Sequence, residues 1–376
     1  MGQQRKIRVG VIFGGRSGEH DVSLRSARAV MGALDPERFE IVPIGIDRQG
    51  RWLAGGDPLA RLESGSELAR LEGRAGDGAD AATTSSELAL VATPTPPIFG
   101  SPQGAGGAPL DVIFPALHGP RGEDGTVQGM LELADIPYVG AGVLASAVAM
   151  DKIMTKLVLD QHGIPQAPWL PLLSRDWRRD PAAVEERIER ELGFPCFVKP
   201  ANLGSSVGIT KVHHAGELAA ALDLAAAHDR RIVVEVGIDA RELEVSVLGN
   251  DDPIASAISE IEPTREFYDY AAKYIDEDGA TFTLPAQIPS ETADALRAMA
   301  IRAFKAIDCA GMARVDFFLE RGTGRLILNE INTIPGFTAI SQYPKMWEAS
   351  GLPFDQLVTR LIELAIERHT DKRTLL

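Results

Sequence analysis

The sequence predicts a protein of the mixed α/β and α+β class, built from three consecutive domains. Its 376 residues exceed the length at which one hydrophobic core usually stops growing, about 250–300 residues. Strand and helix patterns alternate through the N-terminal part, which is typical of a parallel sheet. After residue 236 apolar and polar residues alternate, as they do in antiparallel strands. We expect domains over residues 1–148, 149–235 and 236–376.

The first domain opens with a strand, a glycine turn and a helix. The apolar run at residues 9–12 indicates a buried strand, and Gly14 and Gly15 permit a tight turn after it. Apolar residues then recur at helical spacing between 24 and 34. The stretch "FEIVPIGID" at 39–47 supplies a second strand, so this βαβ unit predicts a parallel sheet.

The segment from about residue 53 to 109 interrupts this domain. It is rich in Gly, Ala, Ser, Thr and Pro, and we expect a loose insertion with at most one strand, "LALVA", and no part in the chemistry. The following "LDVIFPALHGPRGEDGTVQGMLE" predicts a strand, a glycine-rich loop and a helix from about Thr126. These elements complete the first domain.

The second domain mixes helices and strands, whereas the third is dominated by antiparallel strands. In the second we expect a helix ending at Gly163, a strand after Pro165, a helix over 182–192, strands at "CFVKP" and "ITKV", a helix over 217–227 and a strand at "RIVVEVGI". In the third we expect strands at "RELEVSVLG" and "PIASAISEIE", a helix over 291–307, paired strands at "MARVDFFLE" and "LILNEIN" joined through "RGTG", and a final helix.

Composition excludes several classes of function. The net charge of −15 argues against general nucleic-acid binding, which needs clustered Lys and Arg, and it limits attraction to anionic lipid. The apolar stretch at 141–150 is far shorter than the ~20 residues of a membrane-spanning helix, and the N-terminus has no cleavage-site pattern. Cys196 and Cys309 lie in apolar stretches and predict buried thiols in a reducing compartment. We expect a cytoplasmic protein with no nucleic-acid partner and no membrane association.

The loop "LGSSVG" at residues 203–208 directly follows the strand "FVKP" and Ala201-Asn202. A hairpin turn has such a composition, but six residues exceed the two of the tightest hairpins. Small residues expose backbone N–H groups, which together with two hydroxyls suit the oxygens of a polyphosphate. The spacing is that of neither the P-loop nor the dinucleotide fingerprint. Lys199 ends the strand and aims a cation near the loop, unless it merely extends into solvent from an edge strand.

A second set of polar residues lies on the strands "RVDFFLE" and "LNEIN". Arg314 and Asp316 are two residues apart and therefore share a strand face, as do Glu330 and Asn332 on the next strand. If the strands are neighbours, the two carboxylates and the amide offer the hard oxygen ligands that Mg²⁺ prefers beside phosphate. The alternative is a pair of solvated carboxylates. Like charges opposite each other repel, and the apolar neighbours indicate buried strands, so we favour a metal site.

The stretch "TIPGFTAIS" follows these residues. Gly336 can present a backbone N–H, and Ser341 precedes a helical stretch, whose N-terminus is a natural cradle for a carboxylate. An ordinary helix-capping serine is the alternative.

Longer stretches carry a family resemblance. The chain contains, in this order, "GGRSGEHDVSL", "ALHGPRGEDGTVQGMLE", "MDK", "FVKPANLGSSVG", "EFYDYAAKY", "ARVDFFL" and "LNEINTIPGFTAISQYPKMWEASG". In order and approximate spacing they resemble the D-alanine–D-alanine ligases, which are ATP-grasp carboxylate–amine ligases. The resemblance covers nearly the whole chain except the loose insertion and a few terminal residues.

This resemblance implies a three-domain ATP-grasp architecture, in which an N-terminal parallel-sheet domain is followed by two domains that sandwich ATP. It implies ATP- and Mg²⁺-dependent ligation of two D-alanine molecules through a D-alanyl phosphate, for peptidoglycan synthesis. Two Mg²⁺ ions, replaceable by Mn²⁺, would be the cofactors, and a homodimer is implied as the assembly.

The resemblance also implies roles for individual residues. For ATP, Lys152 and Lys199 would contact the phosphates and the loop Gly204–Gly208, with Ser205 and Ser206, would fold over them. Further ATP contacts would come from Glu235 and the backbone of Val236 at the adenine, Glu242 at the ribose, and Lys273 on a mobile loop.

The metal ions would be held by Asp316, Glu330 and Asn332. Arg314 and the Gly336 N–H would stabilise the oxyanion of the tetrahedral intermediate. Glu19 would pair with the ammonium of the first D-alanine, with His118 nearby, while Ser341 would hold the carboxylate of the second. Tyr274, Ser205 and Glu19 would form a hydrogen-bonded latch.

Each role has an alternative that needs no substrate. Glu19 could simply favour the positive end of its helix, His118 could be a loop histidine with ordinary hydrogen bonds, and Lys273 and Tyr274 could be exposed residues. Two other functions fit the same fold: ligation of D-alanine to D-serine or D-lactate, and a non-catalytic nucleotide sensor. By resemblance the "EFYDYAAKY" loop argues against D-lactate, and the presence of Arg314 and of every metal ligand argues against the sensor.

Overall fold

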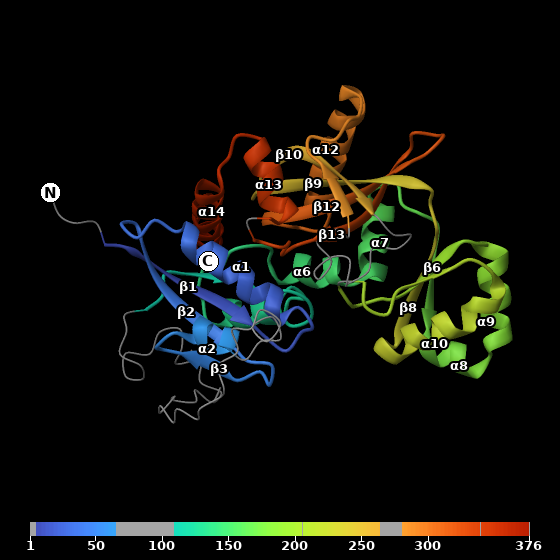
Figure 1. The fold of residues 1–376 in the computed structure, drawn as a ribbon, viewed down its shortest axis with the longest axis horizontal. Coiled ribbons are helices and arrows are strands. Elements are labelled where there is room, and N and C mark those ends of the chain that lie inside the picture. Colours follow the sequence, from blue (N-terminus) through green and yellow to red (C-terminus); the bar gives the residue numbers. More distant parts are fainter. Residues whose placement is uncertain (1–4, 65–108, 205, 264–279, 339, 376) are drawn as a thin grey trace.

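The computed structural model describes residues 5–64, 109–204, 206–263, 280–338 and 340–375, and these residues form three sheets with their helices (Figure 1). The first sheet has the order β3-β2-β1-β4. Strands β1 (Ile7–Gly14), β2 (Phe39–Ile46) and β4 (Val112–Pro115) are parallel, as predicted from the βαβ pattern, and β3 (Trp52–Ala54) pairs antiparallel with β2.

Both faces of the first sheet are buried, which explains its nearly continuous apolar strands. On one face Val9, Val11 and Phe13 pack with helix α1 (His20–Ala33) and with the C-terminal helix α14 (Phe354–Thr374). On the other face Ile12 and its neighbours pack with α5 (Thr126–Leu133).

The turn after β1 requires glycine at Gly14. Its φ is +90°, and a Cβ there would lie 2.1 Å from the carbonyl oxygen of Ile46. This tight turn sends the chain directly into α1, so the loop between them faces the end of the sheet.

Residues 53–64, which we expected to lie in the loose insertion, form the end of β3 and helix α2 (Pro58–Ser64) instead. Leu59 is buried and Leu62 packs against the same core, so these two leucines fix a segment whose Gly-Gly-Asp-Pro stretch hides the helical pattern. The rest of the expected insertion, including "LALVA", lies outside the described residues.

The second sheet has the order β5-β8-β6-β7 and is antiparallel throughout. Its strands are β5 (Trp169–Leu173), β6 (Cys196–Pro200), β7 (Thr210–Val212) and β8 (Arg231–Val236). One face packs on α8 (Ser174–Arg179), α9 (Pro181–Glu191) and α10 (Leu218–His228), and the 3₁₀ turn Ala215–Glu217 precedes α10. The opposite face contacts α7 (Lys152–Gln161) through Ile153 and Val233.

The third sheet is antiparallel with the order β11-β10-β9-β12-β13. Its strands are β9 (Ala240–Gly249), β10 (Ile254–Pro263), β11 (Ala280–Thr283), β12 (Gly311–Glu320) and β13 (Leu326–Asn332). Helices α6 (Val143–Met150), α7 and α12 (Ser290–Ala306) bury one face of it. Helix α13 (Gln342–Ala349) contacts β9 and β10 and leads into α14.

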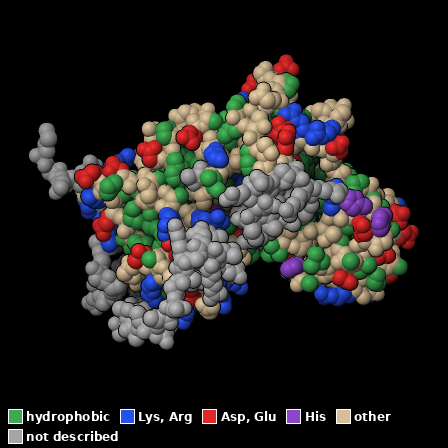
Figure 2. Space-filling model, in the orientation of Figure 1, with side chains coloured by type: hydrophobic (Ala, Val, Ile, Leu, Met, Phe, Trp, Pro, Cys, Tyr) green, Lys and Arg blue, Asp and Glu red, His purple; other side chains and the backbone are tan. Residues whose placement is uncertain are grey.

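Helix α14, at the C-terminal end of the chain, packs against the N-terminal first sheet. Leu357, Leu361 and Leu364 belong to the core of the first sheet, and the guanidinium of Arg368 lies 4.7 Å above the ring of Tyr138. Red α14 accordingly lies beside blue α1 in Figure 1. The described helices include none long and apolar enough to span a bilayer. Acidic and basic side chains are interspersed over the face seen in Figure 2.

Candidate active site

A cavity of about 270 Å³ lies between α7, the inner face of the second sheet, the third sheet and the loops at the end of the first sheet. This volume is near the lower end for small-molecule sites, about 300–1,000 Å³. The predicted site residues among its lining are Glu19, His118, Lys152, Lys199, Ser206, Glu235, Glu242, Arg314, Asp316, Glu330, Asn332, Gly336 and Ser341.

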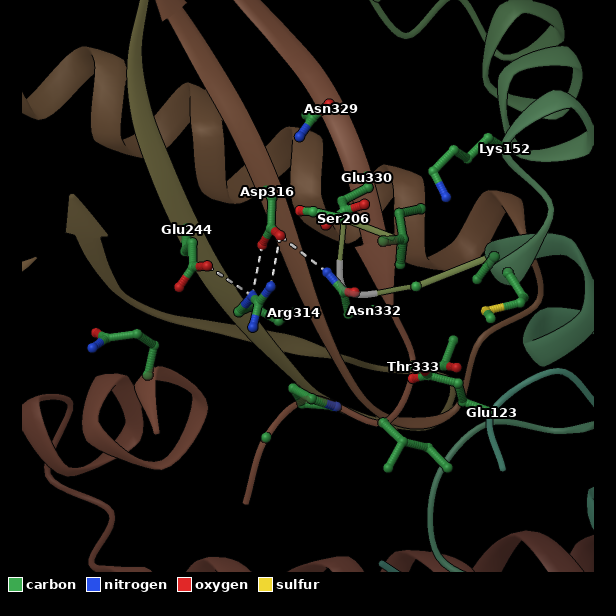
Figure 3. Close-up of a pocket in the computed structure, with 18 of the residues that line it drawn as sticks. Glu123, Lys152, Ser206, Glu244, Arg314, Asp316, Asn329, Glu330, Asn332 and Thr333 are labelled. Atoms are coloured by element: carbon green, nitrogen blue, oxygen red, sulfur yellow. Dashed lines mark hydrogen bonds and ion pairs between the residues drawn. The ribbon is translucent and has the colours of Figure 1, made fainter. Parts of the chain in front are cut away.

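Strands β12 and β13 bring four of these residues to one wall of the cavity. Across the antiparallel pair Arg314 lies opposite Asn332, and Asp316 lies opposite Glu330. Their side chains lie on one face of the hairpin (Figure 3), whereas the alternate residues Val315 and Ile331 are buried. The predicted neighbouring strands and the shared face are thus confirmed.

A β-bulge shapes this wall. The register passes from Asp316–Glu330 to Phe317–Leu328, so Asn329 is an extra residue in β13. Because of it, Leu328 packs into the core although Glu330, two residues on, lines the cavity. In a regular strand Leu328 and Glu330 would lie on the same face. The bulge therefore turns Leu328 into the core and Glu330 toward the cavity.

Arg314 is the cation of this wall. It donates to Asp316 through Nε at 2.7 Å and through its terminal NH2 at 2.8 Å, and Nε lies 3.0 Å from Oε1 of Glu244 on β9. Asn332 donates to the same Asp316 carboxylate at 3.0 Å. Burial opposes the charge of Arg314, but the carboxylates of Asp316 and Glu244 raise its pKa well above the ordinary value. The guanidinium is therefore permanently charged and held in one orientation (Figure 3).

The same wall suits a divalent cation that is completed by phosphate. Asp316, Glu330 and Asn332 supply carboxylate and amide oxygens, which are Mg²⁺ ligands. No cluster of three or more His, Cys, Asp and Glu side chains fit to hold a metal exists among the described residues. Two carboxylates and one amide leave coordination positions open for substrate oxygens, as expected for Mg²⁺ bound through few carboxylates plus phosphate.

Lysines form the opposite wall. Lys199 on β6 donates to Oε2 of Glu235 on β8 at 3.0 Å, and the ammonium of Lys156 on α7 lies 3.4 Å from the other oxygen, Oε1. Lys152, one helical turn before Lys156, donates to the carbonyl of Leu203 at 2.6 Å. Burial by itself would raise the pKa of Glu235, but these lysines lower it to about 2.

The described residues of the loop 203–208 adjoin the cavity. Leu203, Gly204 and Ser206 line it, and Ser206 and Gly208 have φ values of +59° and +74°. The Val207 N–H donates to the Gly204 carbonyl at 3.2 Å. Since β6 and β7 pair on either side of it, the segment is a hairpin loop, and its described residues contribute to the cavity wall.

Glu19 and His118 lie side by side at the end of the first sheet. The Nδ1 of His118 contacts the Ile334 carbonyl at 3.1 Å, and its Nε2 contacts the Ser26 hydroxyl at 2.9 Å. Burial lowers the pKa of His118, although the nearby carboxylate of Glu19 raises it. A neutral ring with Nδ1–H donating to the carbonyl fits both contacts, so His118 links the first sheet to the loop after β13.

Glu123 is a second carboxylate at this end. Its Oε1 accepts the Gly119 N–H at 2.8 Å, and a Cβ added at Gly204 would lie 3.6 Å from Glu19 and 3.8 Å from Glu123. Burial and then repulsion from Glu19 raise the pKa of Glu123 to about 8. Two carboxylates that approach a glycine-lined gap favour a bound cationic group such as an ammonium.

Gly336 and Ser341 form the floor near α13. Ser341 is the N-cap residue of α13, but its hydroxyl makes no capping hydrogen bond. It accepts the Thr338 N–H at 3.0 Å and lies 2.8 Å from the Thr338 hydroxyl. A Cβ at Gly336 would lie 3.0 Å from the Ser341 hydroxyl, so these two residues are in close contact at the cavity wall.

Not every predicted residue reaches the described cavity. Val236 is not among its lining residues, and its N–H donates to the Pro168 carbonyl at 2.9 Å. Ser205, Lys273 and Tyr274 lie outside the described residues.

Three charged lining residues were missed by the sequence analysis: Glu123, Lys156 and Glu244. Lys156 could have been found, because it stands four residues after Lys152 on the same helix face. Glu123 lies within the "HGPRGEDG" stretch that carried the resemblance, but nothing in its spacing indicates that it faces Glu19. Glu244 depends on the register of β9 against β12, which pairs it with Asp316.

The chain is similar in sequence to known proteins over most of its length. Residues 8–141 match the family described as D-ala D-ala ligase N-terminus, and residues 158–363 match the D-ala D-ala ligase C-terminus. Relatives include D-alanine--D-alanine ligases of Deinococcus radiodurans, 50% identical with 96% of this chain and 99% of the relative covered, and of Geobacillus kaustophilus, 48% identical with 98% and 97% covered.

Solved structures agree. A D-alanine-D-alanine ligase from Coxiella burnetii has a TM-score of 0.80 and 38% identity, with 98% of this chain and 97% of that one covered. The VanG D-Ala:D-Ser ligase from Enterococcus faecalis has the same TM-score of 0.80 at 35% identity, with 96% and 100% covered. The similarity therefore extends over all three sheets.

Proposed function

The chain belongs to the D-alanine–D-alanine ligase family, and from this premise we propose how its cavity joins two D-alanine molecules with ATP. The single observation that supports the proposal is the register of β12 and β13, which gathers Arg314, Asp316, Glu330 and Asn332 on one wall opposite two lysines. The chemistry needs this arrangement, because a carboxylate does not accept an amine until its oxygen becomes a good leaving group. Phosphorylation by ATP achieves this.

ATP lies between the second and third sheets in this proposal. Lys152 and Lys199 contact its phosphates, and the loop 204–208 covers them with backbone N–H groups and the hydroxyls of Ser205 and Ser206. Glu235 meets the adenine, together with the backbone of Val236, and Glu242 meets the ribose. Lys273 adds a further ATP contact.

Asp316, Glu330 and Asn332 would hold two Mg²⁺ ions, or Mn²⁺ in their place. Bound there, the ions would supply neutralisation of charge on the transferring phosphoryl group. The fit rests on the donor set described above, in which two carboxylates face each other across the strand pair beside an amide.

The two D-alanine molecules occupy the other end of the cavity. Glu19, beside His118, pairs with the ammonium of the first D-alanine, whose carboxylate is phosphorylated. Ser341 holds the carboxylate of the second, whose amine attacks the acyl phosphate. Arg314 and the Gly336 N–H then stabilise the oxyanion that forms. Because water would hydrolyse the acyl phosphate, a cover must exclude it, which is the role we assign to the loop 204–208 and to the latch of Tyr274, Ser205 and Glu19.

The test is release of phosphate from ATP by the purified protein, with Mg²⁺ and a panel of D-alanine, D-serine and D-lactate. Release that depends on D-alanine, with the D-Ala-D-Ala dipeptide as the main product, supports the proposal. Release without any amino acid, or none at all, would reject it. A larger yield of the mixed product with D-serine would instead assign D-Ala:D-Ser ligation, the activity of the Enterococcus faecalis relative.

We also propose a cytoplasmic homodimer that supplies the dipeptide for peptidoglycan synthesis, with domain boundaries near residues 148 and 236. Light scattering at several protein concentrations tests the dimer, and limited proteolysis tests the boundaries.

A further inference from the structure

A buried carboxylate in the nucleotide half of the cavity is shared between two lysines. Glu235 is 4% exposed and Lys156 is 3% exposed. One carboxylate oxygen accepts from Lys199 at 3.0 Å, and the other lies 3.4 Å from the ammonium of Lys156. Each oxygen therefore faces its own cation.

The fold produces this arrangement from two separate elements. Strands β6 and β8 are neighbours with Phe197 opposite Glu235, so Lys199, two residues on, shares the face of Glu235. Helix α7 crosses that face and presents Lys152 and Lys156 one turn apart. Lys152 points toward the loop at Leu203, whereas Lys156 points toward Glu235.

Lys199 has two competing partners in this site. It now contacts Glu235, but the proposed function requires it to contact the ATP phosphates. Moving it would remove one of the two cations from a carboxylate that lies almost completely out of water. An unpaired buried charge is strongly unfavourable, so Lys199 can move readily only if another cation remains on Glu235.

We propose that Lys156 is this remaining cation: a positioning residue that keeps Glu235 ionised and oriented toward the adenine when Lys199 transfers to the phosphates. The inference rests on the proposed nucleotide roles of Lys199 and Glu235 and adds a role for Lys156. Lys156 suits this role because helix α7, and not the nucleotide, holds its side chain beside Glu235. Its ammonium is too deeply buried to be an ordinary solvated lysine, and its only described carboxylate within ion-pairing distance is Glu235.

The experiment compares two ligands that differ in what they demand of Lys199. A non-hydrolysable ATP analogue with Mg²⁺ requires Lys199 to leave Glu235, whereas adenosine does not. In Lys156→Met the dissociation constant of the analogue should rise about ten- to a hundredfold, because Lys199 stays on Glu235. That of adenosine, measured by competition calorimetry on the full chain, should change less than about threefold.

Two further variants separate charge from packing. Lys156→Gln, which still donates a hydrogen bond to Glu235 and keeps the interior polar, should show the same selective loss even if Lys156→Met fails to fold. In a Glu235→Gln background no charge is left behind, so adding Lys156→Met should weaken the analogue less than about threefold further. Lys305→Met, at an exposed position of α12, is the matched control and should bind both ligands as the unmodified chain does.

Equal weakening of both ligands in Lys156→Gln, or no weakening of either, would overturn the inference, since Lys156 would then be structural or dispensable. An additive loss in the Glu235→Gln background would overturn it as well. These outcomes differ from failure of the proposed function, in which the unmodified chain itself would not bind the ATP analogue.

Discussion

Replacing Arg314 by Lys tests the assignment of the oxyanion contact while keeping the positive charge. Arg314 makes two hydrogen bonds to Asp316, at 2.7 and 2.8 Å, and its Nε lies 3.0 Å from Glu244. An ammonium cannot reproduce this planar fork and at the same time reach a third acceptor. Loss of one charge-assisted hydrogen bond costs about 1.5–3 kcal/mol of stability, which the intact ion pair partly offsets.

The catalytic effect is larger than the effect on stability. Loss of one oxyanion donor costs about 2.7–4 kcal/mol of transition-state stabilisation, which corresponds to a fall in kcat of about 10²–10³. Because the oxyanion exists only after the amine has attacked, the KM for ATP should change little. Coupled-enzyme detection of phosphate release at varied ATP and D-alanine measures both parameters, and thermal melting confirms that the variant is folded.

Arg325→Lys provides the matched control at the other end of the same hairpin. Its side chain is 53% exposed and pairs with Glu320, and exposed pairs contribute only about 0–1 kcal/mol. It should leave kcat within about twofold. If folded Arg314→Lys kept kcat within tenfold of the unmodified enzyme, or lost activity only through the KM for ATP, the oxyanion role of Arg314 would be refuted.

Three further outcomes are expected. The pKa of Glu123 is raised from 4.5 to about 8, so the contribution of this carboxyl to folding stability is present below pH 4.5 and is lost as the pH rises to 8. Glu123→Gln should therefore flatten this part of the pH dependence of the free energy of urea unfolding. An unchanged pH dependence would contradict the burial of that carboxyl. Gly336→Ala places a Cβ 3.0 Å from the Ser341 hydroxyl and should raise the KM for D-alanine roughly tenfold, while the KM for ATP stays unchanged. Equal changes in the two KM values would count against a contact between this residue and D-alanine. EDTA in excess should abolish phosphate release, with recovery on adding Mg²⁺ or Mn²⁺, whereas activity that survives EDTA would exclude the proposed ions.

Local sequence patterns predicted most of the elements because each element carries its own signal. The hairpin of Arg314–Asp316 and Glu330–Asn332 followed from the two-residue period of strands, and the first parallel sheet followed from a βαβ pattern. Both patterns need only a few neighbouring residues, so no knowledge of the tertiary structure was necessary.

Features that depend on distant parts of the chain could not be predicted in this way. The sequence indicates the bulge at Asn329 only weakly. Leu328 and Ile331 are both buried although they lie three residues apart, which does not fit the two-residue period of a regular strand. The pairing of Glu244 with Asp316 requires the register between β9 and β12, which are separated by about half of the third domain. The return of α14 to the first sheet is likewise a tertiary contact that no local pattern encodes.

The nucleotide half shows the same division. Lys199 was found from its place at the end of a strand, but its present partner, Glu235, depends on the antiparallel pairing of β6 and β8. The fixed N–H of Val236, which donates to Pro168, follows from the path of the chain before β5. Residue type and spacing therefore gave the kind of site, whereas the pairing of strands decides which groups contact one another.

The most direct test of the account is a crystal structure with the non-hydrolysable ATP analogue and Mn²⁺, with anomalous diffraction recorded at the manganese edge. The proposed metal and phosphate site predicts anomalous peaks within coordination distance of Asp316, Glu330 and Asn332, each also contacting a phosphate oxygen, with Arg314 beside them. Peaks elsewhere, or a triphosphate bound away from this wall, would contradict it.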